Sequence, residues 1–354
     1  MKYGSPVSVI IPVFNVRPYL AQALDSVLAQ TYGNLDILII DDGSTDGSAG
    51  ICDAYAARDG RVRVVHQPHM GLSAARNAGL ARMRGEAVAF IDADDAYLPS
   101  FAETMVSAMV RERADITVCR FGVCRTTGPL LSAGQSVRPE IPPGTYDRIS
   151  ALRALTDQSL NNSVWNKLYL RELWRDIRFP EGHFYEDVDT FFRVLDCCGR
   201  VCVLGEKLYL YRKRPESITA TPSPGNLRDR IRAYEHFIGF IRAHIPGIFT
   251  PEHLQKTRQV RLTCMIALYL VSSGREDDGS GASGSRLRRR IIAAKKETGL
   301  CHLPFRIKAA YRLITVCPGL LKRIYPMYLR IRQFLLRPAA GKPCMRGAGG
   351  NPPA

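Results

Sequence analysis

Ala87-Val-Ala-Phe-Ile-Asp-Ala-Asp-Asp95 joins five apolar residues to three carboxylates within nine positions. The apolar half, Ala87 to Ile91, has the length and composition of a buried strand. Carboxylates this close together repel one another unless a cation or hydrogen-bond donors neutralise them. A hard divalent ion held by one or two carboxylates and by substrate phosphates fits this pattern. The alternative is a solvated acidic turn that caps a helix predicted at Leu98 to Arg111.

The 86 residues before this stretch alternate between short apolar runs and longer amphipathic ones. Strands are predicted at Val7 to Ile11, Asp36 to Ile40 and Val62 to Val65. Helices are predicted between them at Pro18 to Gln30, Ser44 to Ala57 and Leu72 to Arg84. This order predicts an α/β fold with a doubly wound, mostly parallel, Rossmann-like sheet. Because ligands bind beyond the carboxyl ends of such strands, polar residues that directly follow strands are the candidates for a site.

Two aspartates, Asp41 and Asp42, follow the second predicted strand and precede Gly43 and Ser44. A carboxylate fixed at this strand end can accept the imide N–H of uracil, a group that cytosine lacks. Ser44 or Thr45 is also suited to cap the next helix, which does not account for two successive aspartates.

The segment Gly71 to Gly79 begins the third predicted helix with small residues that allow close packing on the sheet. Arg76 in this segment has two candidate roles, reaching a diphosphate or holding a nearby aspartate. A solvated arginine is the plainer alternative.

Four segments, taken in order, resemble family 2 glycosyltransferases with the A-type (GT-A) nucleotide-diphospho-sugar fold. They are Val7-Ser-Val-Ile-Ile-Pro-Val-Phe-Asn15, Ile40-Asp-Asp-Gly-Ser-Thr-Asp46, Gly71-Leu-Ser-Ala-Ala-Arg-Asn-Ala-Gly79 and Phe90-Ile-Asp-Ala-Asp-Asp95. The resemblance covers roughly Ser5 to Thr219. It implies a bacterial-type, inverting enzyme that uses a UDP-sugar donor together with Mn or Mg.

The resemblance also implies roles for individual residues. Pro12, Phe14 and Asp42 border the uracil-type base. Asp92 approaches the ribose and the metal, and Asp94 binds the ion that bridges the diphosphate. Asp95 is expected to be a supporting acid or a helix cap.

Two later segments, Val164 to Tyr169 and Phe184 to Phe191, resemble the acceptor-side segments of bacterial members of this family. Asp187 is the candidate for the base that takes the proton of the attacking acceptor hydroxyl. Glu186 and Asp189 are competitors for this role. The alternative for all three is that acids are favoured at the start of a helix by its macrodipole.

Cations are expected to stabilise the departing nucleoside diphosphate. Lys167, Arg212 and Arg214 are available, and Arg212 to Thr219 resembles a family segment that closes over the phosphates, although each residue alone is more often a surface charge. The residues that we expect to bind the nucleotide sugar are Pro12, Phe14, Asp41, Asp42, Arg76, Asp92, Lys167 and Arg212. The metal ligands expected are Asp94 and Asp92.

The net charge of +16 is concentrated in the last third of the chain. Residues 1–220 carry 25 Lys and Arg against 26 Asp and Glu, and residues 221–354 carry 24 against 7. A neutral first part and a basic second part argue against a nucleic-acid partner and favour an anionic membrane surface for the basic part. The alternatives are a solvated helical cap or an oligomer contact, and the oligomeric state is left open.

We therefore predict a catalytic domain at 1–220, with a nucleotide-binding half at 1–120 and an acceptor-side half at 121–220. A helical basic region at 221–337 and a disordered tail at 338–354 are predicted to follow. The start of the chain lacks the apolar core of a signal peptide. The longest apolar run, Leu262 to Val271, is half of the roughly 20 residues that a membrane span needs. The expected location is cytoplasmic, with peripheral attachment to the inner face of the plasma membrane.

The predicted function is transfer of a sugar to a hydroxyl of a glycan or lipid-linked acceptor in the synthesis of a capsule, exopolysaccharide or O-antigen. A sugar nucleotidyltransferase is one alternative, although Pro12 to Arg17 lacks the Gly-rich phosphate loop that such an enzyme would want. An inactive, membrane-associated nucleotide-sugar-binding protein is the other.

Overall fold

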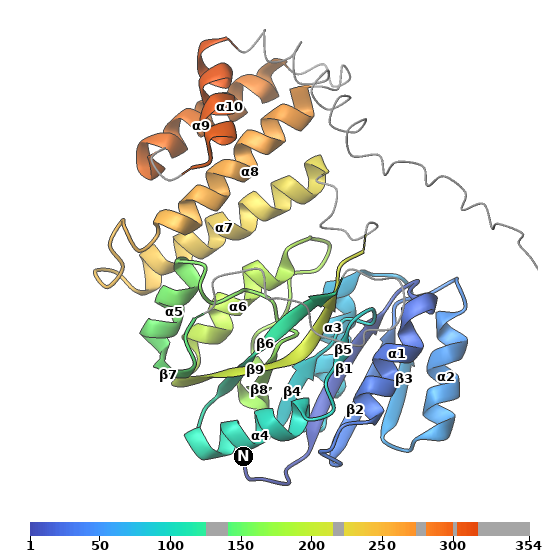
Figure 1. Ribbon diagram of the computed structural model, residues 1–354. Helices are drawn as coiled ribbons and strands as arrows, with labels where there is room; N and C mark the ends of the chain where they lie inside the picture. Colours follow the sequence, from blue (N-terminus) through green and yellow to red (C-terminus); the bar gives the residue numbers. More distant parts are fainter. Residues whose placement is uncertain (125–140, 215–222, 274–280, 300–302, 318–354) are drawn as a thin grey trace, which may run out of the picture. The chain divides into compact units, whose positions relative to one another are not determined.

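A computed structural model describes residues 1–124, 141–214, 223–273, 281–299 and 303–317 (Figure 1). The chain divides into two compact units, Met1–Met265 and Ile266–Ala354. The predicted domain boundary after residue 220 therefore falls inside the first unit. The predicted tail at 338–354, most of the loop before Gly144 and the residues after Arg214 in the predicted closing segment lie outside the described ranges.

The first unit begins with the predicted alternation of strands and helices. Its elements are β1 (Val7–Val13), α1 (Arg17–Leu28), β2 (Leu35–Asp41), α2 (Ser48–Arg58), β3 (Val62–His66), α3 (Leu72–Arg82) and β4 (Ala87–Phe90). The four strands are parallel and lie in the order β3-β2-β1-β4. The predicted doubly wound α/β sheet is thereby confirmed.

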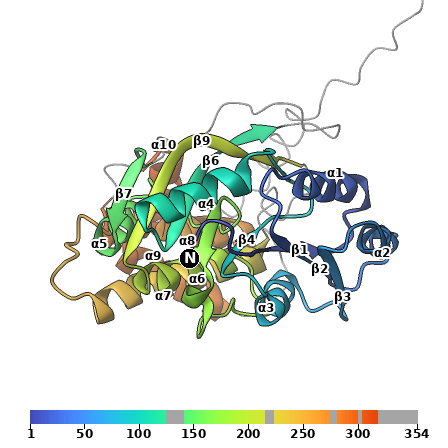
Figure 2. The ribbon, with the colours of Figure 1, turned by 90° about the horizontal axis from the view of Figure 1, so that it is seen from below.

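Alternate residues of these strands face two different cores, as the period of two in a strand requires. Ile10 of β1 packs in one core, whereas its neighbours Val9 and Ile11 pack in the other. The first core also takes apolar residues of α3, and the second takes those of α1 and α2. Figure 2 shows the helices on both faces of the sheet. The sheet is therefore buried on both sides, and its strand ends are left for function.

Beyond β4 the sheet becomes mixed. The further elements are β5 (Ala96–Tyr97), α4 (Phe101–Glu112), β6 (Ile116–Cys124), β7 (Gly144–Asp147), α5 (Arg148–Thr156), β8 (Lys167–Leu170), a 3-10 turn (Arg171–Trp174), α6 (Glu186–Asp196) and β9 (Arg200–Arg212). Strand β8 pairs antiparallel with both β4 and β6, and β6 pairs parallel with β9. Strand β5, directly after the aspartate run, pairs with the end of β9. This pairing brings residues near Asp95 beside those near Arg212.

The helix α7 (Pro224–His244) belongs to the first unit. Its side chains Tyr234, Phe237, Ile238 and Ile241 are buried in the same core as those of α5 and α6. The next helix, α8 (Gln255–Ser273), starts in the first unit, where the Thr257 hydroxyl donates to a carbonyl of α5. The apolar core of the first unit thus includes residues beyond 220.

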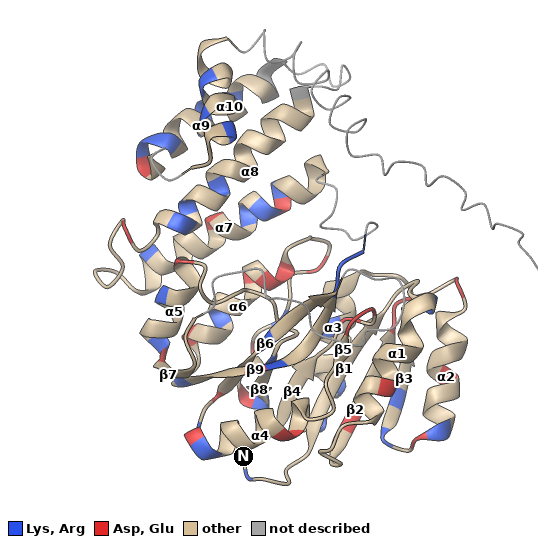
Figure 3. Ribbon diagram, viewed as in Figure 1, with Lys and Arg blue, Asp and Glu red and all other residues tan. Residues whose placement is uncertain are grey.

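The described part of the second unit is helical, as predicted. It contains the end of α8, then α9 (Gly281–Thr298) and α10 (Phe305–Val316), which contact each other. Figure 3 shows that Lys and Arg predominate on α9 and α10. Within the described ranges, no helix combines the length and the apolar character needed to cross a bilayer.

Candidate active site

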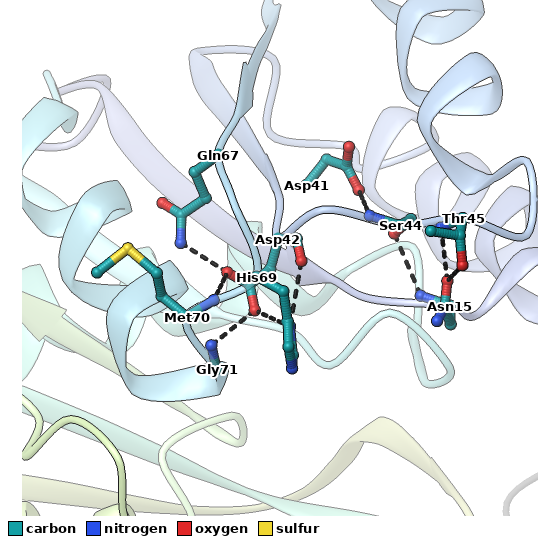
Figure 4. Close-up of polar contacts among 9 residues, drawn as sticks. All are labelled: Asn15, Asp41, Asp42, Ser44, Thr45, Gln67, His69, Met70 and Gly71. Atoms are coloured by element: carbon teal, nitrogen blue, oxygen red, sulfur yellow. Dashed lines mark hydrogen bonds and ion pairs between the residues drawn. The ribbon is translucent and has the colours of Figure 1, made fainter.

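Asp42 is buried at the end of β2, and its carboxylate accepts four hydrogen bonds (Figure 4). Oδ1 accepts from Gln67 Nε2 at 2.7 Å and from the Met70 backbone N–H at 3.0 Å. Oδ2 accepts from the Gly71 backbone N–H at 2.8 Å and lies 2.8 Å from His69 Nδ1. Both oxygens are thus fully engaged, and Asp42 ties the end of β2 to the segment that enters α3. Nothing in the sequence pattern pointed to Gln67 or His69.

Asp41 is also buried and holds two different partners. Its carboxylate accepts from the Ser44 backbone N–H at 3.1 Å and lies 2.8 Å from His66 Nδ1. The opposite ring nitrogen of His66 lies 3.0 Å from Asp53. The hydrogen bond to Asp41, followed by the one to Asp53, raises the pKa of His66. The parallel register of β2 and β3 places Asp41 opposite His66, so the two acids of this turn serve separate anchors.

The turn after Asp42 delays the start of α2, which begins at Ser48 and not at Ser44 as predicted. Asn15 accepts from the Thr45 backbone N–H at 2.8 Å, and Asp46 accepts from the Ser48 backbone N–H at 2.9 Å. These side-chain bonds hold residues 45–48 in a turn, so that the helix begins only at Ser48. The turn instead connects the ends of β1 and β2.

Phe14 presents an exposed aromatic surface beside this turn. Its ring stacks on the His69 ring with centroids 3.8 Å apart and an interplanar angle of 16°. Phe14 remains 41% exposed, whereas Pro12, near the end of β1, is buried. A flat, accessible ring pair at the carboxyl end of β1 is suited to stacking with a planar base.

The aspartate run after β4 separates into three environments. Asp92 accepts a hydrogen bond from Arg76 Nη2 at 2.9 Å, and Asp94 Oδ2 lies 2.6 Å from Arg214 Nε. Asp95 is buried and accepts from the Tyr209 hydroxyl at 2.6 Å and the Arg212 backbone N–H at 2.7 Å. Burial, and after it the charge of Asp92, raises the pKa of Asp94. Asp92 and Asp94 face cations, whereas Asp95 supports the β5–β9 pairing.

Arg76 connects this run to the acceptor-side acids. The guanidinium is buried, with Nη2 on Asp92 and Nη1 on Glu186. Of the alternatives that the sequence left open, the structure shows Arg76 holding a nearby aspartate. It also shows a link to Glu186, 110 positions along the chain, that sequence reasoning missed.

The three acids in the first turn of α6 differ in their partners. Glu186 pairs with Arg76, and both carboxylate oxygens of Asp189 lie 3.0 Å from His236 Nδ1 on α7. Asp187 accepts from the Val188 backbone N–H at 2.8 Å and forms no ion pair within the described ranges. Burial raises the pKa of Asp187, although the charge of Arg76 acts against the rise. Burial also raises the pKa of Glu186, so the distinction lies in the ion pairs. Asp187 is the one of the three that pairs with no cation among the described residues, which favours it as the proton acceptor.

Two predicted cations lie in contrasting places. Lys167 is buried and donates to Asn161 Oδ1 at 2.7 Å, to Asn166 Oδ1 at 2.9 Å and to the Ser163 carbonyl. Burial lowers the pKa of Lys167 to about 7. Its hydrogen-bond acceptors all lie at 161–166, and its Nζ lies 4.6 Å from the centre of the Phe191 ring on α6. These contacts brace the turn before β8, and the predicted contact of Lys167 with the donor stays a prediction.

Arg212 lies next to the aspartate run, where a cation that contacts the diphosphate was expected. Its Nε donates to the Asp94 carbonyl at 2.9 Å, and Nη2 donates to Gln22 at 2.6 Å. The guanidinium carbons of Arg212 and Arg214 lie 4.8 and 5.1 Å from the centre of the Tyr19 ring. Two cations are thus stacked on one ring beside Asp94.

Comparison with known proteins gives a consistent result. The model of the family described as "Glycosyl transferase family 2" matches residues 8–183. Glycosyltransferase GlyA of Streptococcus pneumoniae is 35% identical over 227 residues, which are 62% of this chain and 32% of GlyA. The matched part of EpsJ of Bacillus subtilis, an uncharacterised glycosyltransferase, is 63% of that protein at 32% identity. The chain thus spans less than two thirds of the length of these two relatives.

Glycosyltransferase GlyG of Streptococcus pneumoniae is 31% identical over 229 residues, which are 61% of this chain and 73% of GlyG. Among solved structures, S. aureus TarS 1-349 in complex with UDP-GlcNAc superposes with a TM-score of 0.63. The alignment covers 93% of this chain and 92% of TarS 1-349 at 19% identity. The fold is therefore the GT-A type seen in TarS.

Proposed function

Because this chain belongs to glycosyl transferase family 2, we propose that it transfers a sugar from a UDP-sugar to a hydroxyl of a glycan or lipid-linked acceptor. The proposed setting is the synthesis of a cell-surface polysaccharide. The observation that carries the proposal is the division of carboxylates around Arg76. This buried cation pairs with Asp92 through one nitrogen and with Glu186 through another. In the sequence, Asp94 lies two positions after Asp92, and Asp187 directly follows Glu186. Such a division supports a donor side and an acceptor side in one site.

The donor nucleotide is proposed to bind at the carboxyl ends of β1 and β2. The Phe14–His69 pair supplies a stacking surface, and Asp42 holds the segment 67–71 in place. Pro12 and Asp41 belong to the supporting turn. The choice of a uridine nucleotide is supported by the structure of TarS 1-349, which is a complex with UDP-GlcNAc. Because Asp42 already has four donors, we propose that it borders the base by fixing His69 and not by contacting the imide.

Asp94 and Asp92 are the residues proposed to hold Mn or Mg. Within the described ranges, no three His, Cys, Asp or Glu side chains form a ready-made metal site. Asp92 and Asp94, two positions apart in the sequence and each paired with an arginine, supply the carboxylates for an ion that takes its remaining ligands from a bound diphosphate and water. Burial raises the pKa of Asp94, so a bound cation would stabilise the charged form of this carboxylate. The ion would supply charge neutralisation to the leaving diphosphate.

Arg212 and Arg214 lie beside Asp94, where they can help to stabilise the same leaving group. On the other side, Asp187 is proposed to take the proton from the acceptor hydroxyl as it attacks the anomeric carbon. Glu186 is proposed to keep Arg76 in place. A single displacement of this kind inverts the anomeric configuration, which NMR of the product would show.

The test is UDP release from a panel of UDP-sugars, with and without EDTA and with and without candidate acceptors. The proposal expects metal-dependent release from one donor that an acceptor accelerates. Formation of a nucleotide sugar from a sugar phosphate would point to a nucleotidyltransferase. Tight donor binding without any release would point to an inactive binding protein.

We further propose that the second unit attaches the enzyme peripherally to an anionic membrane surface. The described residues after Met265 carry one acid, Glu297, and the basic residues Arg286, Arg288, Arg289, Arg290, Lys295, Lys296, Arg306, Lys308 and Arg312. On α10, Phe305 and Val316 are 82% and 76% exposed, whereas Ile314 is fully buried. The helical period places Phe305, Arg312 and Val316 on the side opposite Ile314. An apolar and basic outer face is typical of helices that lie in a membrane interface.

A further inference from the structure

The helix α7 contacts four positions in the segment that carries the acid pair. Phe184 donates its backbone N–H to Asp229 at 3.1 Å, and His183 Nε2 lies 2.7 Å from Arg232 Nη1. The guanidinium carbon of Arg230 lies 5.1 Å from the centre of the Tyr185 ring. Each contact joins a side chain of α7 to a residue just before Glu186. Figure 1 shows α7 next to α6, in agreement with their packing in one core.

The fourth contact lies on the other side of the acid pair. Asp189, two residues after Asp187, has both carboxylate oxygens 3.0 Å from His236 on α7. Arg230 and His236 therefore hold positions two residues before and two residues after Asp187. Glu186 is held from α3 by Arg76. Among the described residues, Asp187 is thus the one acid of this turn that forms no ion pair, between neighbours held by Arg76, Arg230 and His236.

The backbone conformation of Tyr185 shows why these contacts matter for the start of α6. Tyr185 has φ of 61° and ψ of 37°, the left-handed conformation that residues with a Cβ rarely adopt. Such a conformation persists only where the surroundings enforce it, and it clusters at functional sites. Tyr185 directly precedes α6, and no side-chain cap fixes this helix end. The direction in which α6 starts, and with it the position of the Asp187 carboxylate, depends on how Tyr185 is held.

We propose that α7 is a positioning element of the active site, in which Arg230 and His236 set the place of Asp187. This inference rests on the proposed function, because it takes Asp187 as the base. It assigns to α7 a role in turnover beyond its contribution to the core. Arg230 acts through the Tyr185 ring, and His236 acts through Asp189. Neither residue is proposed to touch the substrate.

The test uses the full chain and compares Arg230→Gln with Arg228→Gln, a matched change at an exposed arginine on the same helix. We expect Arg230→Gln to lower kcat by about tenfold or more, because misplacing a reacting group by even ~1 Å is costly. The Kd for UDP should change less than about twofold, because the donor side is untouched. Arg230→Lys should restore part of kcat, since it keeps a cation over the ring. Arg228→Gln should resemble the unmodified enzyme.

Two further readouts separate positioning from stability. Displacing the base should move the acidic limb of the pH profile of kcat in Arg230→Gln, which a loss of folded protein would not do. A double-mutant cycle with Tyr185→Leu should show that the two changes are not additive in kcat. Where Arg230→Gln lowers the yield of folded enzyme too far, His236→Asn gives the same comparison.

The inference fails if Arg230→Gln and His236→Asn both keep the kcat and pH profile of Arg228→Gln. It also fails if their loss of kcat equals the loss of folded protein. A separate result would overturn the base assignment itself. Near-normal turnover by Asp187→Asn would remove the proposed base, whereas an inactive Asp187→Asn with a normal Arg230→Gln would remove only the role of α7.

Discussion

Asp187 and the acids beside it carry the same charge, yet they have different partners in the structure. Replacing Asp187 by Asn should lower transfer by about 10²–10⁴-fold, because the amide cannot take a proton. Binding of UDP should be nearly unchanged, since Asp187 is proposed to act on the acceptor. Turnover assays and calorimetric titration with UDP measure the two effects. Asp176→Asn, at an exposed acid away from the site, is the control.

The raised pKa of Asp187 predicts the direction of the pH dependence. Only the unprotonated carboxylate is a base, so activity should fall as the pH drops through this pKa. Because burial raises that pKa, the fall should begin at a higher pH than for an exposed aspartate. The measurement is kcat against pH at saturating donor. An acidic limb at or below the ordinary aspartate range would contradict the assignment.

Substitutions of the neighbours Asp94 and Asp95 should have different effects. Asp94→Asn should abolish activity and the response to added Mn or Mg, because it removes the proposed metal ligand. Asp95→Asn should leave the metal response in place but lower the free energy of unfolding by about 1–3 kcal/mol, since it disturbs buried hydrogen bonds to Tyr209 and Arg212. Metal titration of activity and denaturant unfolding distinguish the two. A metal response that survives in Asp94→Asn would contradict the first expectation.

At the scale of elements, the local pattern predicted the four parallel strands to within two residues. The start of α2 and the mixed part of the sheet were harder to predict from the sequence. The start of α2 depends on Asn15, which lies 30 positions before its partner Thr45. Strand β5 has only two residues and forms by pairing with β9. Contacts between distant segments leave no periodic signal in either segment.

The same reasoning explains what the sequence predicted of the site. Asp92 and Asp94 were recognisable because they follow a strand directly. The link from Arg76 to Glu186 and the contacts of α7 join separate elements, so no local motif announces them. Lys167 was proposed as a donor contact because of its motif, but its charge is enclosed by oxygens of the preceding turn.

The membership of α7 in the catalytic core leads to a prediction for shortened chains. A chain that ends at residue 222 lacks α7 and with it Phe237, whose ring stacks on that of Phe192 with centroids 5.0 Å apart. The core around Phe192 is then exposed. Each large side chain removed from the core costs about 1.5–3 kcal/mol, so this chain should aggregate or unfold at a lower temperature. A chain that ends at Ser273 should keep a cooperative transition. Equal thermal stability of the two shortened chains would contradict the boundary described above.

At the scale of the whole molecule, the charge is divided between two parts with different proposed partners. The first unit carries the acids that we propose for the nucleotide-sugar site, and basic residues predominate in the described part after Met265. A lipid-linked acceptor would be confined to a membrane surface. Attachment through a separate basic region would raise its local concentration without altering the site.

Flotation with lipid vesicles tests this division. The full chain should float with phosphatidylcholine vesicles that contain phosphatidylglycerol, and much less with phosphatidylcholine alone. Added salt should weaken the binding, because it screens the attraction of basic residues to anionic lipid. A chain that ends at Ser273 lacks α9 and α10 and should stay unbound. Equal flotation of this chain and the full chain would contradict the proposal.

The outer face of α10 is tested by Phe305→Ser combined with Arg312→Gln. This pair should weaken vesicle binding by about tenfold, since it removes one inserted ring and one cation from the interface. The matched control combines Ile248→Ser and Arg228→Gln, an exposed apolar residue and an exposed arginine of the first unit. With a water-soluble acceptor, both double variants should release UDP at the rate of the unmodified enzyme. If the two double variants float equally well, the outer face of α10 does not dock on the membrane. If the α10 variant alone loses activity in solution, this face serves catalysis instead.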